Sequence, residues 1–235
     1  MRDDPADPVT PRAKPWSGGG REELAAAVRR LMEVTVTAAA TPGLLAETAE
    51  RVAALADVLD RHVPASGPVP TARFAEDVVG TDDVYSLASA MPFDVVIGSC
   101  NPVALPITVD YEPEKAIGRG TFTAPYEGAP GCVHGAVLAG AFDIMLTAAN
   151  VLANGAGPTV NLSIRYLKPT LIAQPVVFEA WVTSMDGRRT HSKGRLVQGG
   201  VVTVEAVGEF VNMKRSRIAS MHRRDAAPGP GDGSS

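Results

Sequence analysis

The sequence predicts an α+β protein in which an antiparallel sheet wraps around one long buried helix, with an N-terminal helical extension in front of it. Two observations carry this prediction. Residues 136–152 form a long apolar run with a single ionisable residue, Asp143. Six shorter runs have the alternation of strands, two before this helix and four after it, and turn-forming residues lie between most of them.

The composition is that of an ordinary soluble globular protein. Of the 235 residues, 45% are hydrophobic and 20% are charged. A net charge of −4 supplies no basic field for nucleic acid. Cys100 and Cys132, the two cysteines, make neither a disulfide framework nor a zinc-binding spacing. Residues 1–20 lack the apolar core of a secretion signal, so we expect a cytoplasmic protein. From the charge and the cysteine spacing we expect no metal, cofactor or nucleic-acid partner.

The chain divides into four segments by composition. Residues 1–20 and 214–235 are predicted to be disordered tails because they have few apolar residues. Residues 21–70 are predicted to form the helical extension, with a break at Thr41-Pro42-Gly43, and residues 92–213 the main domain. The apolar stripes of the two extension helices are Leu24, Val28, Leu31 and Thr35, and Leu45, Thr48, Val52, Leu55 and Leu59. Two such helices could pack as a hairpin, and we expect them to be a cover or an oligomer contact, since they contain no chemistry.

The strands of the main domain are predicted from alternation and from turn residues. The expected strands are residues 105–111, 118–126, 159–168, 176–185, 190–198 and 201–213. Glu112-Pro113, Asp186-Gly187 and Gly199-Gly200 are expected to form hairpin turns. The sheet is therefore expected to be mainly antiparallel.

The apolar helix is the most informative segment. A helix that is apolar around its circumference should be buried on all sides. It is short for a bilayer, which needs about 20 apolar residues, and Asp143 lies near its middle. Burying a carboxylate costs on the order of several kcal/mol unless hydrogen-bond donors or cations compensate for the lost hydration. Asp143 is therefore either anchored by donors for structural reasons or retained for chemistry.

The start of this helix suits a polarised carbonyl. Gly128, Pro130, Gly131 and Gly135 let the backbone approach a ligand closely, and the first helical turn presents unpaired N–H groups. The segment lacks the Lys of a phosphate loop, so nucleotide binding is not expected. His134 is either a capping or packing residue or a catalytic one, and we expect Cys132 to be inert.

Helix geometry predicts a dimer if the two features form one site. Asp143 lies nine residues after His134, which is about 13 Å along the axis and roughly on the opposite side. One helix therefore cannot bring its start and Asp143 to the same small substrate. Two antiparallel copies can, because each offers its helix start to the other's Asp143. On the strand after the helix, Thr159, Asn161 and Ser163 are expected to share one face.

Three stretches resemble the hotdog-fold acyl-CoA thioesterases of the phenylacetate-pathway type. They are Tyr126-Glu-Gly-Ala-Pro-Gly-Cys-Val-His-Gly-Ala136, then Asp143, then Thr159-Val-Asn-Leu-Ser-Ile-Arg-Tyr-Leu-Lys-Pro169. The resemblance covers about residues 92–213. It implies a hotdog fold, hydrolysis of an acyl-CoA thioester, and a homodimer that could assemble further into a tetramer or hexamer.

The resemblance also implies the role of each site residue. Gly135 would polarise the thioester carbonyl through its N–H, and Asp143 of the other subunit would act as general base or nucleophile. Thr159 would place the attacking water, and His134 would orient the loop or contact substrate near the carbonyl. For CoA we expect contacts from Arg165, Lys168 and Asn161.

Two positions depart from the family pattern, and two rival functions stay open. Ala136 stands where the family usually has a second Gly, and Gly128 stands where some members have an Asn that contacts the carbonyl. A hotdog dehydratase or hydratase needs a His upstream of the helix, and the one present is His62, in the extension. A non-catalytic acyl-CoA binding module is the rival from another class.

Overall fold

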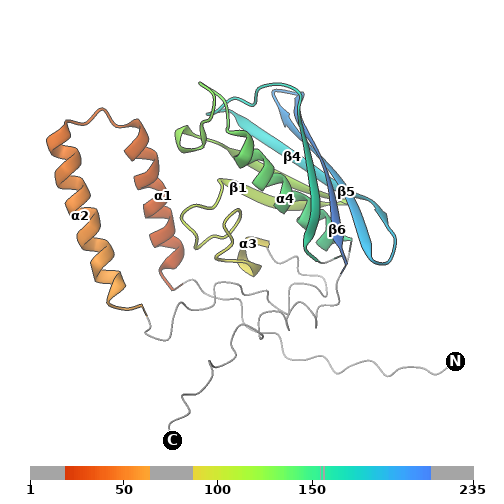
Figure 1. Cartoon of the computed structure of the whole chain (residues 1–235), viewed down its shortest axis with the longest axis horizontal. Coiled ribbons are helices and arrows are strands. Elements are labelled where there is room, and N and C mark those ends of the chain that lie inside the picture. Colours follow the sequence, from red (N-terminus) through yellow and green to blue (C-terminus); the bar gives the residue numbers. More distant parts are fainter. Residues whose placement is uncertain (1–18, 64–86, 154, 156, 213–235) are drawn as a thin grey trace, which may run out of the picture.

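The computed structural model describes residues 19–63, 87–153, 155 and 157–212. Apart from residues 19 and 20, both predicted tails lie outside the described residues, as does the predicted helix end at 64–70. The described chain contains one six-stranded sheet, a long helix packed on it and a pair of N-terminal helices (Figure 1). The predicted α+β arrangement is confirmed.

The sheet is antiparallel throughout. Its strand order is β1-β2-β4-β5-β6-β3. The strands are β1 (Ile107–Glu112), β2 (Lys115–Thr121), β3 (Thr159–Tyr166), β4 (Pro175–Met185), β5 (Arg189–Gln198) and β6 (Val201–Val211). The connection through α4 (Gly135–Leu152) leads the chain to the far edge of the sheet, so β3 has a paired neighbour on one side only, β6.

The three predicted hairpin turns are confirmed, and one strand end was wrong. The first hairpin closes with Glu112 paired to Lys115, and positive φ angles follow at Gly187, Gly199 and Gly200 in the other two. The second strand was expected over residues 118–126, yet it runs over Lys115–Thr121 and Ala124–Tyr126 form a 3-10 helix. The partner of Thr121 is Pro175, the first residue of β4, and it has no N–H to donate to the ladder.

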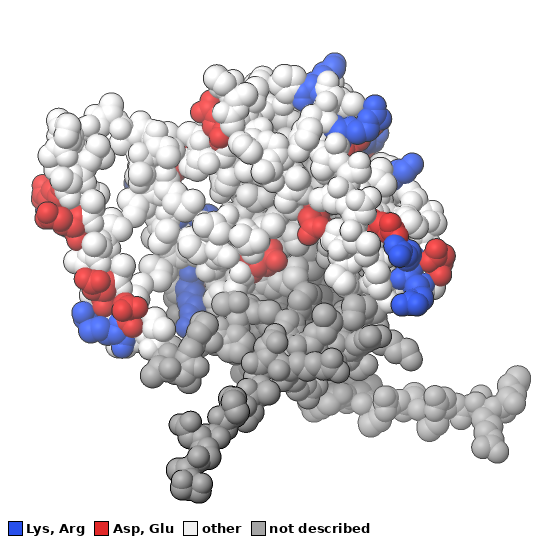
Figure 2. Space-filling view, in the orientation of Figure 1, with Lys and Arg blue, Asp and Glu red and all other residues white. Residues whose placement is uncertain are grey.

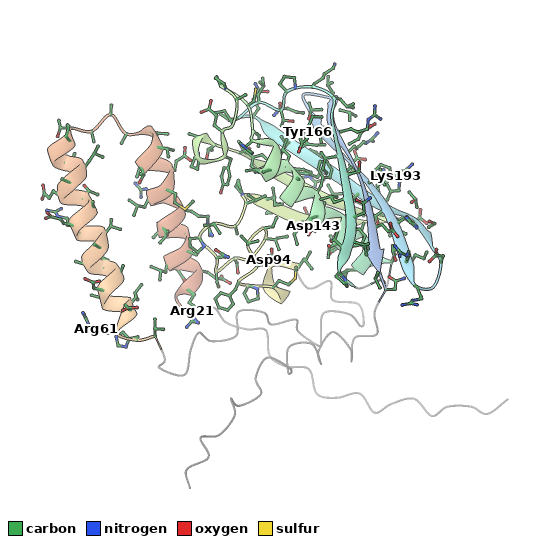
Figure 3. The ribbon with its side chains drawn as sticks, viewed as in Figure 1. Arg21, Arg61, Asp94, Asp143, Tyr166 and Lys193 are labelled. Atoms are coloured by element: carbon green, nitrogen blue, oxygen red, sulfur yellow. The ribbon has the colours of Figure 1, made fainter. Side chains whose placement is uncertain are left out.

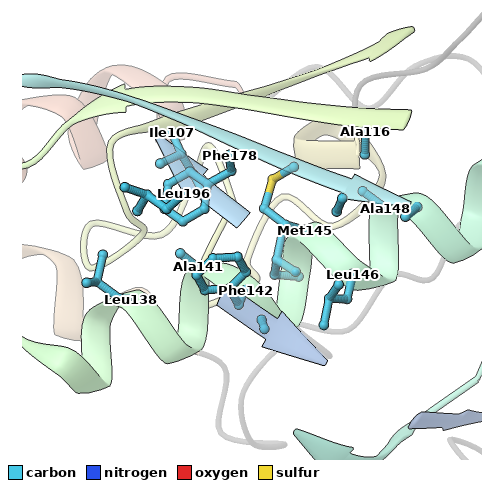
Figure 4. Packing of buried hydrophobic residues seen from close by; sticks show 14 of the residues in the cluster. Ile107, Ala116, Leu138, Ala141, Phe142, Met145, Leu146, Ala148, Phe178 and Leu196 are labelled. Atoms are coloured by element: carbon cyan, nitrogen blue, oxygen red, sulfur yellow. The ribbon is translucent and has the colours of Figure 1, made fainter. Parts of the chain in front are cut away.

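The core lies between α4 and the concave face of the sheet. Nine residues of α4 are buried. Phe142 of α4 meets Phe178 of β4 edge to face, with 5.2 Å between ring centroids, and Leu196 of β5 is fully buried beside them (Figure 4). Burial of this apolar surface is the main stabilising term of the domain.

One prediction about α4 needs correction, because the helix is not buried on all sides within one chain. Ala136 is exposed, and Gly140, Asp143, Thr147 and Val151 are only partly buried. These positions recur every three or four residues, so they form a single open stripe. By length and composition α4 would also pass as a membrane span, as core helices of soluble proteins do. Its position against the sheet accounts for its apolar character.

The extension consists of α1 (Arg21–Thr37) and α2 (Pro42–Asp60), and α1 alone is fastened to the domain. Ala25 is buried, Arg29 Nη1 donates to the carbonyl of Asn101 at 2.9 Å, and Thr123 donates to Glu33. α2 lies outermost (Figure 1) and has no buried residue. The closed hairpin that the two helices could form is therefore not present. A short helix, α3 (Leu87–Ala90), was not predicted.

Candidate active site

His134 caps the first turn of α4. Its backbone is extended and its Nδ1 accepts a hydrogen bond from the Ala136 N–H at 3.0 Å. A ring nitrogen that accepts carries no proton, so in the neutral ring the proton sits on Nε2. His134 is exposed, and its remaining donor therefore faces the surroundings of the helix start. The capping interpretation of His134 is confirmed, and a role at the substrate stays a prediction.

Gly135 offers the one free N–H of this turn. The N–H groups of Val137 and Leu138 both bond to the His134 carbonyl, at 3.0 and 3.2 Å. The Leu138 bond is the first regular bond of the helix. The His134 N–H bonds to the Tyr126 carbonyl and the Ala136 N–H to the His134 ring, so with Val137 three of the four orphan donors of this helix start are used. The Gly135 N–H has no hydrogen-bond partner within the described part of the chain. It is therefore the donor left for a ligand.

Tyr166, at the end of β3, holds the next peptide in place. Its hydroxyl donates to the Gly135 carbonyl at 2.8 Å. A Cβ at position 135 would lie 3.2 Å from the Tyr166 ring and hydroxyl, so glycine lets the ring sit directly against the helix start. The 135–136 peptide is thus fixed at both ends, by Tyr166 at its carbonyl and by His134 at its N–H. Sequence analysis missed this role, because the contact joins residues 31 apart.

The loop before the helix packs closely against His134, and this close packing requires glycine at position 128. A Cβ at that position would lie 2.8 Å from the His134 Cα. The neighbouring backbone bonds run from the Gly128 N–H to the Cys132 carbonyl and from the His134 N–H to the Tyr126 carbonyl, at 2.9 and 2.8 Å. Gly131 has φ 75°, which favours glycine. The absence of the family's Asn at 128 therefore follows from close packing on His134.

The phenol of Tyr126 helps to anchor this loop to the domain. Its ring meets Phe122 edge to face, with 5.7 Å between centroids. Burial raises the pKa of Tyr126, an effect that the positive charge of Arg29 opposes and the negative charge of Glu33 reinforces. The hydroxyl therefore stays protonated at neutral pH and can donate to the Ala104 carbonyl, 3.3 Å away.

Asp143 has one partner in the described chain, Thr159. The Thr159 hydroxyl donates to Asp143 Oδ1 at 2.7 Å, across from β3 to α4. The other carboxylate oxygen is left to accept, and the side chain is only partly buried on the open stripe of α4. A carboxylate held on one oxygen and free on the other can take a proton from a water molecule. In Figure 3 Tyr166 lies near the start of α4, and Asp143 lies further along the helix.

The expectation that Thr159, Asn161 and Ser163 share one face was wrong. A β-bulge lies between Thr159 and Asn161, and an extra residue reverses the alternation. Thr159 therefore points to α4, while Asn161 and Ser163 lie opposite Glu209 and Val207, on the outer face of the sheet. The bulge is what brings the Thr159 hydroxyl to Asp143.

The three predicted CoA contacts are not gathered at the Asp143 carboxylate. Arg165 is on the outer face, where its Nη1 lies 3.2 Å from Glu205 Oε2. Lys168 is exposed in the segment after β3, and Asn161 is exposed on its outer face. All three lie on or just beyond the same edge strand, and their contact with CoA stays a prediction.

Gly135 and Asp143 are separated along the helix. Eight residues correspond to about 12 Å of rise and a rotation of about 80°. The opposite-side arrangement expected for the helix start therefore applies to His134, and Gly135 lies closer to the side of Asp143. The axial separation alone keeps a carbonyl at Gly135 out of reach of the Asp143 carboxylate in the same chain. Among the described residues, no three His, Cys, Asp or Glu side chains gather to hold a metal ion.

Comparison with known proteins places these residues in a family segment. Residues 130–206 match the thioesterase superfamily model. That segment contains the start of α4, Asp143, and all of β3. A crystal structure described as a thioesterase superfamily protein is similar to this chain with a TM-score of 0.70 and 29% identity, over 83% of this chain and 96% of its own. The predicted hotdog fold is confirmed.

Shorter likenesses are found in other solved structures. Zebrafish thioesterase superfamily member 2 is 17% identical, with a TM-score of 0.43 over 46% of this chain and 82% of its own. A mutant of the phenylacetic acid degradation protein PaaI from Thermus thermophilus is 19% identical, with a TM-score of 0.43 over 46% and 95%. A search of curated proteins found no match to this chain.

Proposed function

We propose that this chain hydrolyses an acyl-CoA thioester to a free acid and CoA, in a site shared by two copies. The observation that carries the proposal is the pairing of Thr159 with Asp143 at 2.7 Å, on a helix whose first turn has one free N–H, at Gly135. Both features lie in the segment that matches the thioesterase superfamily.

Each residue has a role in the proposed reaction. The thioester carbonyl oxygen accepts from the Gly135 N–H, which stabilises the negative charge that develops on that oxygen. A water molecule next to Asp143 loses a proton to the carboxylate, and its oxygen attacks the carbonyl carbon. Thr159 holds the carboxylate through its proton, and the lone pairs of its hydroxyl can orient the water. The carbon–sulfur bond then breaks and the CoA thiolate takes up a proton.

The open stripe of α4 supports the sharing of the site. Asp143 lies on this stripe with the small residues Ala136 and Gly140, so a second helix can approach closely there. The strand next to it, β3, is the last in the sheet order. An edge strand has unpaired N–H and C=O groups that a second chain can use. Two copies joined along this side would bring the Gly135 of one toward the Asp143 of the other.

The rival functions make different demands. A hydratase would need an upstream histidine near the carboxylate, and His62 is exposed just beyond the end of α2, in the extension. A binding module would need the acyl-CoA pocket without the base, and the Thr159–Asp143 pair would then have a structural role alone. A cytoplasmic location remains part of the proposal.

The test is release of free thiol from a panel of acyl-CoAs. Asp143→Asn keeps the size of the side chain but removes the base, so turnover should fall about 10²–10⁴-fold. Asp110→Asn on β1 is the matched control, since that carboxylate pairs with Arg119 at the surface, 3.0 Å away. Near-normal turnover in a folded Asp143→Asn chain would reject the mechanism. Binding of acyl-CoA without thiol release by the unaltered chain would favour the binding module.

A further inference from the structure

The surface of α2 is unusual for a helix that faces solvent. Every residue of α2 is exposed, including large apolar side chains on one side of it. Leu55 is 67% exposed, Leu44 54% and Leu59 52%. The acidic residues lie away from this side, and Arg51, which pairs with Glu47, borders it next to Leu44. Figure 2 shows red acidic side chains on the outer margin of α2 and white surface toward α1.

This stripe has the spacing of a helix–helix seam. Leu45, Val52 and Leu59 are seven residues apart, with Thr48 and Leu55 between them. This three-and-four alternation is the a/d pattern that packs against other helices. α1 has the same spacing along Leu24, Val28, Leu31 and Thr35, and its Leu24 is 46% exposed. The two helices therefore offer half of a helical bundle.

The extension is an ordered part of the molecule that is attached to the domain through α1. The first three turns of α1 are tied to the domain: Arg29 bonds to the Asn101 carbonyl at 2.9 Å and Glu22 accepts from Ser99 at 3.0 Å. α2 begins with a Thr41 cap and Pro42 in its first turn. The similar crystal structure covers 83% of this chain. Since residues 92–213 are about half of the chain, that similarity reaches into the extension.

We propose that the α1–α2 extension pairs with the same extension of a second copy, with the two α2 stripes at the centre of a four-helix bundle. Charge favours this occupant. The flanks of the seam are small or apolar at Ala49, Ala56 and Val58, while Glu47, Glu50, Asp57 and Asp60 point away from it. The acidic surfaces of two copies therefore stay apart while their apolar stripes meet.

The size and the symmetry of the contact also favour a second copy of the extension as the partner. A helix of 19 residues is about 28 Å long, so two helices side by side present roughly 28 by 20 Å. That is about 560 Å², which is smaller than the roughly 800 Å² per partner of a standard interface but exceeds the roughly 500 Å² per partner that a specific interface needs. A twofold contact uses the same patch on both copies. A lipid surface fits less well, because helices that lie on membranes usually have a basic polar face.

The experiment places a reporter on the stripe of the full chain. In a Cys132→Ser background, Leu55→Cys carries a pyrene label, and Cys100 is buried and so protected from labelling. Paired stripes should give excimer emission that falls when unlabelled chain is added. Ala54→Cys, on the charged side, is the matched position and should give none.

Two further substitutions separate the stripe from the helix as a whole. Val52→Glu added to Leu55→Cys should reduce the excimer signal at least tenfold, whereas Ala54→Glu should preserve it, with equal helix content by circular dichroism in both. The proposal is overturned if position 55 gives no excimer, if positions 54 and 55 give the same signal, or if phosphatidylcholine–phosphatidylglycerol vesicles replace the excimer by monomer emission. None of these readouts depends on thioester hydrolysis.

Discussion

The hydroxyl of Tyr166 is the contact that joins the edge strand to the start of α4. Tyr166→Phe keeps the ring against Gly135 and removes only the donor to the Gly135 carbonyl. A lost hydrogen bond of this type is worth about 1 kcal/mol, so we expect turnover to fall about fivefold. The carbonyl can bond to water instead, and the melting temperature should therefore change little. The measurement is kcat for thiol release beside a thermal melt.

The outcome against this expectation is equally clear. A Tyr166→Phe chain with normal kcat would show that the ring alone sets the geometry. Tyr166→Leu provides the control for the ring, because it loses both the hydroxyl and the flat contact with Gly135.

Thr159 gives a second residue-scale prediction, based on its bond to Asp143. Thr159→Ala removes the only described partner of that carboxylate, and turnover should fall about five- to tenfold, which corresponds to about 1 kcal/mol or slightly more. Thr159→Ser keeps a hydroxyl at the same atom and should restore most of the rate. The measurement is turnover per folded molecule. A loss of folded protein with unchanged turnover per molecule would point to a purely structural role.

The sequence predicted the site residues better than their surroundings. Asp143 and Gly135 are recognisable from local pattern, because one is a lone charge in an apolar helix and the other follows a glycine-rich loop. The role of Tyr166 depends on a contact across 31 positions, and the orientation of Thr159 depends on a β-bulge. Neither can be inferred from alternation, since a single extra residue reverses the faces of a strand.

At the scale of elements, the outer face of the sheet contains an ion-pair cluster with a defined pH response. Glu179 on β4 contacts Lys115 and Arg195, at 3.4 and 3.0 Å. Burial pushes the pKa of Glu179 upward, but the hydrogen bonds and charges of Arg195 and Lys115 outweigh it, and the pKa lies below its usual 4.5. A carboxylate with a lowered pKa stabilises the fold above the unfolded-state pKa.

Glu179→Gln tests this cluster. At neutral pH the variant should lose about 1 kcal/mol of stability, because it lacks the charge that pairs with Lys115 and Arg195. The loss is no larger because both cations are partly solvated, and water weakens their ion pairs with Glu179. As the pH falls below 4.5 and through the lower folded-state value, the wild type loses this contribution and the two melting temperatures should converge. Thermal melts from pH 3 to pH 7 (roughly the range over which a carboxylate titrates) measure the difference. A difference between the two melting temperatures that stays constant over this range would contradict the lowered pKa of Glu179.

The elements themselves were predicted well where periodicity is strong. The long helix and five of the six strands agree with their expected limits to within about two residues. The errors have tertiary causes: the second strand ends early where its partner in β4 is Pro175, and α2 does not close onto α1. An amphipathic stripe predicts that a helix is covered, but it does not identify the covering surface.

At the scale of the whole molecule, one chain leaves two surfaces open. The stripe of α4 has small residues beside Asp143, and the stripe of α2 is mainly apolar, and neither is covered within the described chain. Sequence pattern alone predicted α4 to be buried on all sides, because burial by a second chain and burial within one chain give the same composition. The proposed shared site and the proposed bundle assign a second copy to each surface.

The shared site leads to a complementation experiment. Gly135→Pro removes the N–H that the thioester carbonyl needs, and Asp143→Asn removes the base, so each variant alone should be inactive. Gly135→Ala is the matched control for Pro, because its Cβ meets Tyr166 at the same 3.2 Å while the N–H is kept. It should retain most of the activity, which would separate loss of the donor from crowding of the ring.

Mixing the two inactive chains should restore activity in part. About 12 Å of helix separates the two positions, so each site must combine Gly135 of one chain with Asp143 of the other. A mixed dimer then has one site with both lesions and one site with neither, and it should reach up to half of the wild-type rate. The measurement is thiol release by heterodimers purified through two different affinity tags. If these heterodimers stay inactive while both variants are folded, each site draws on a single chain and the shared arrangement is wrong.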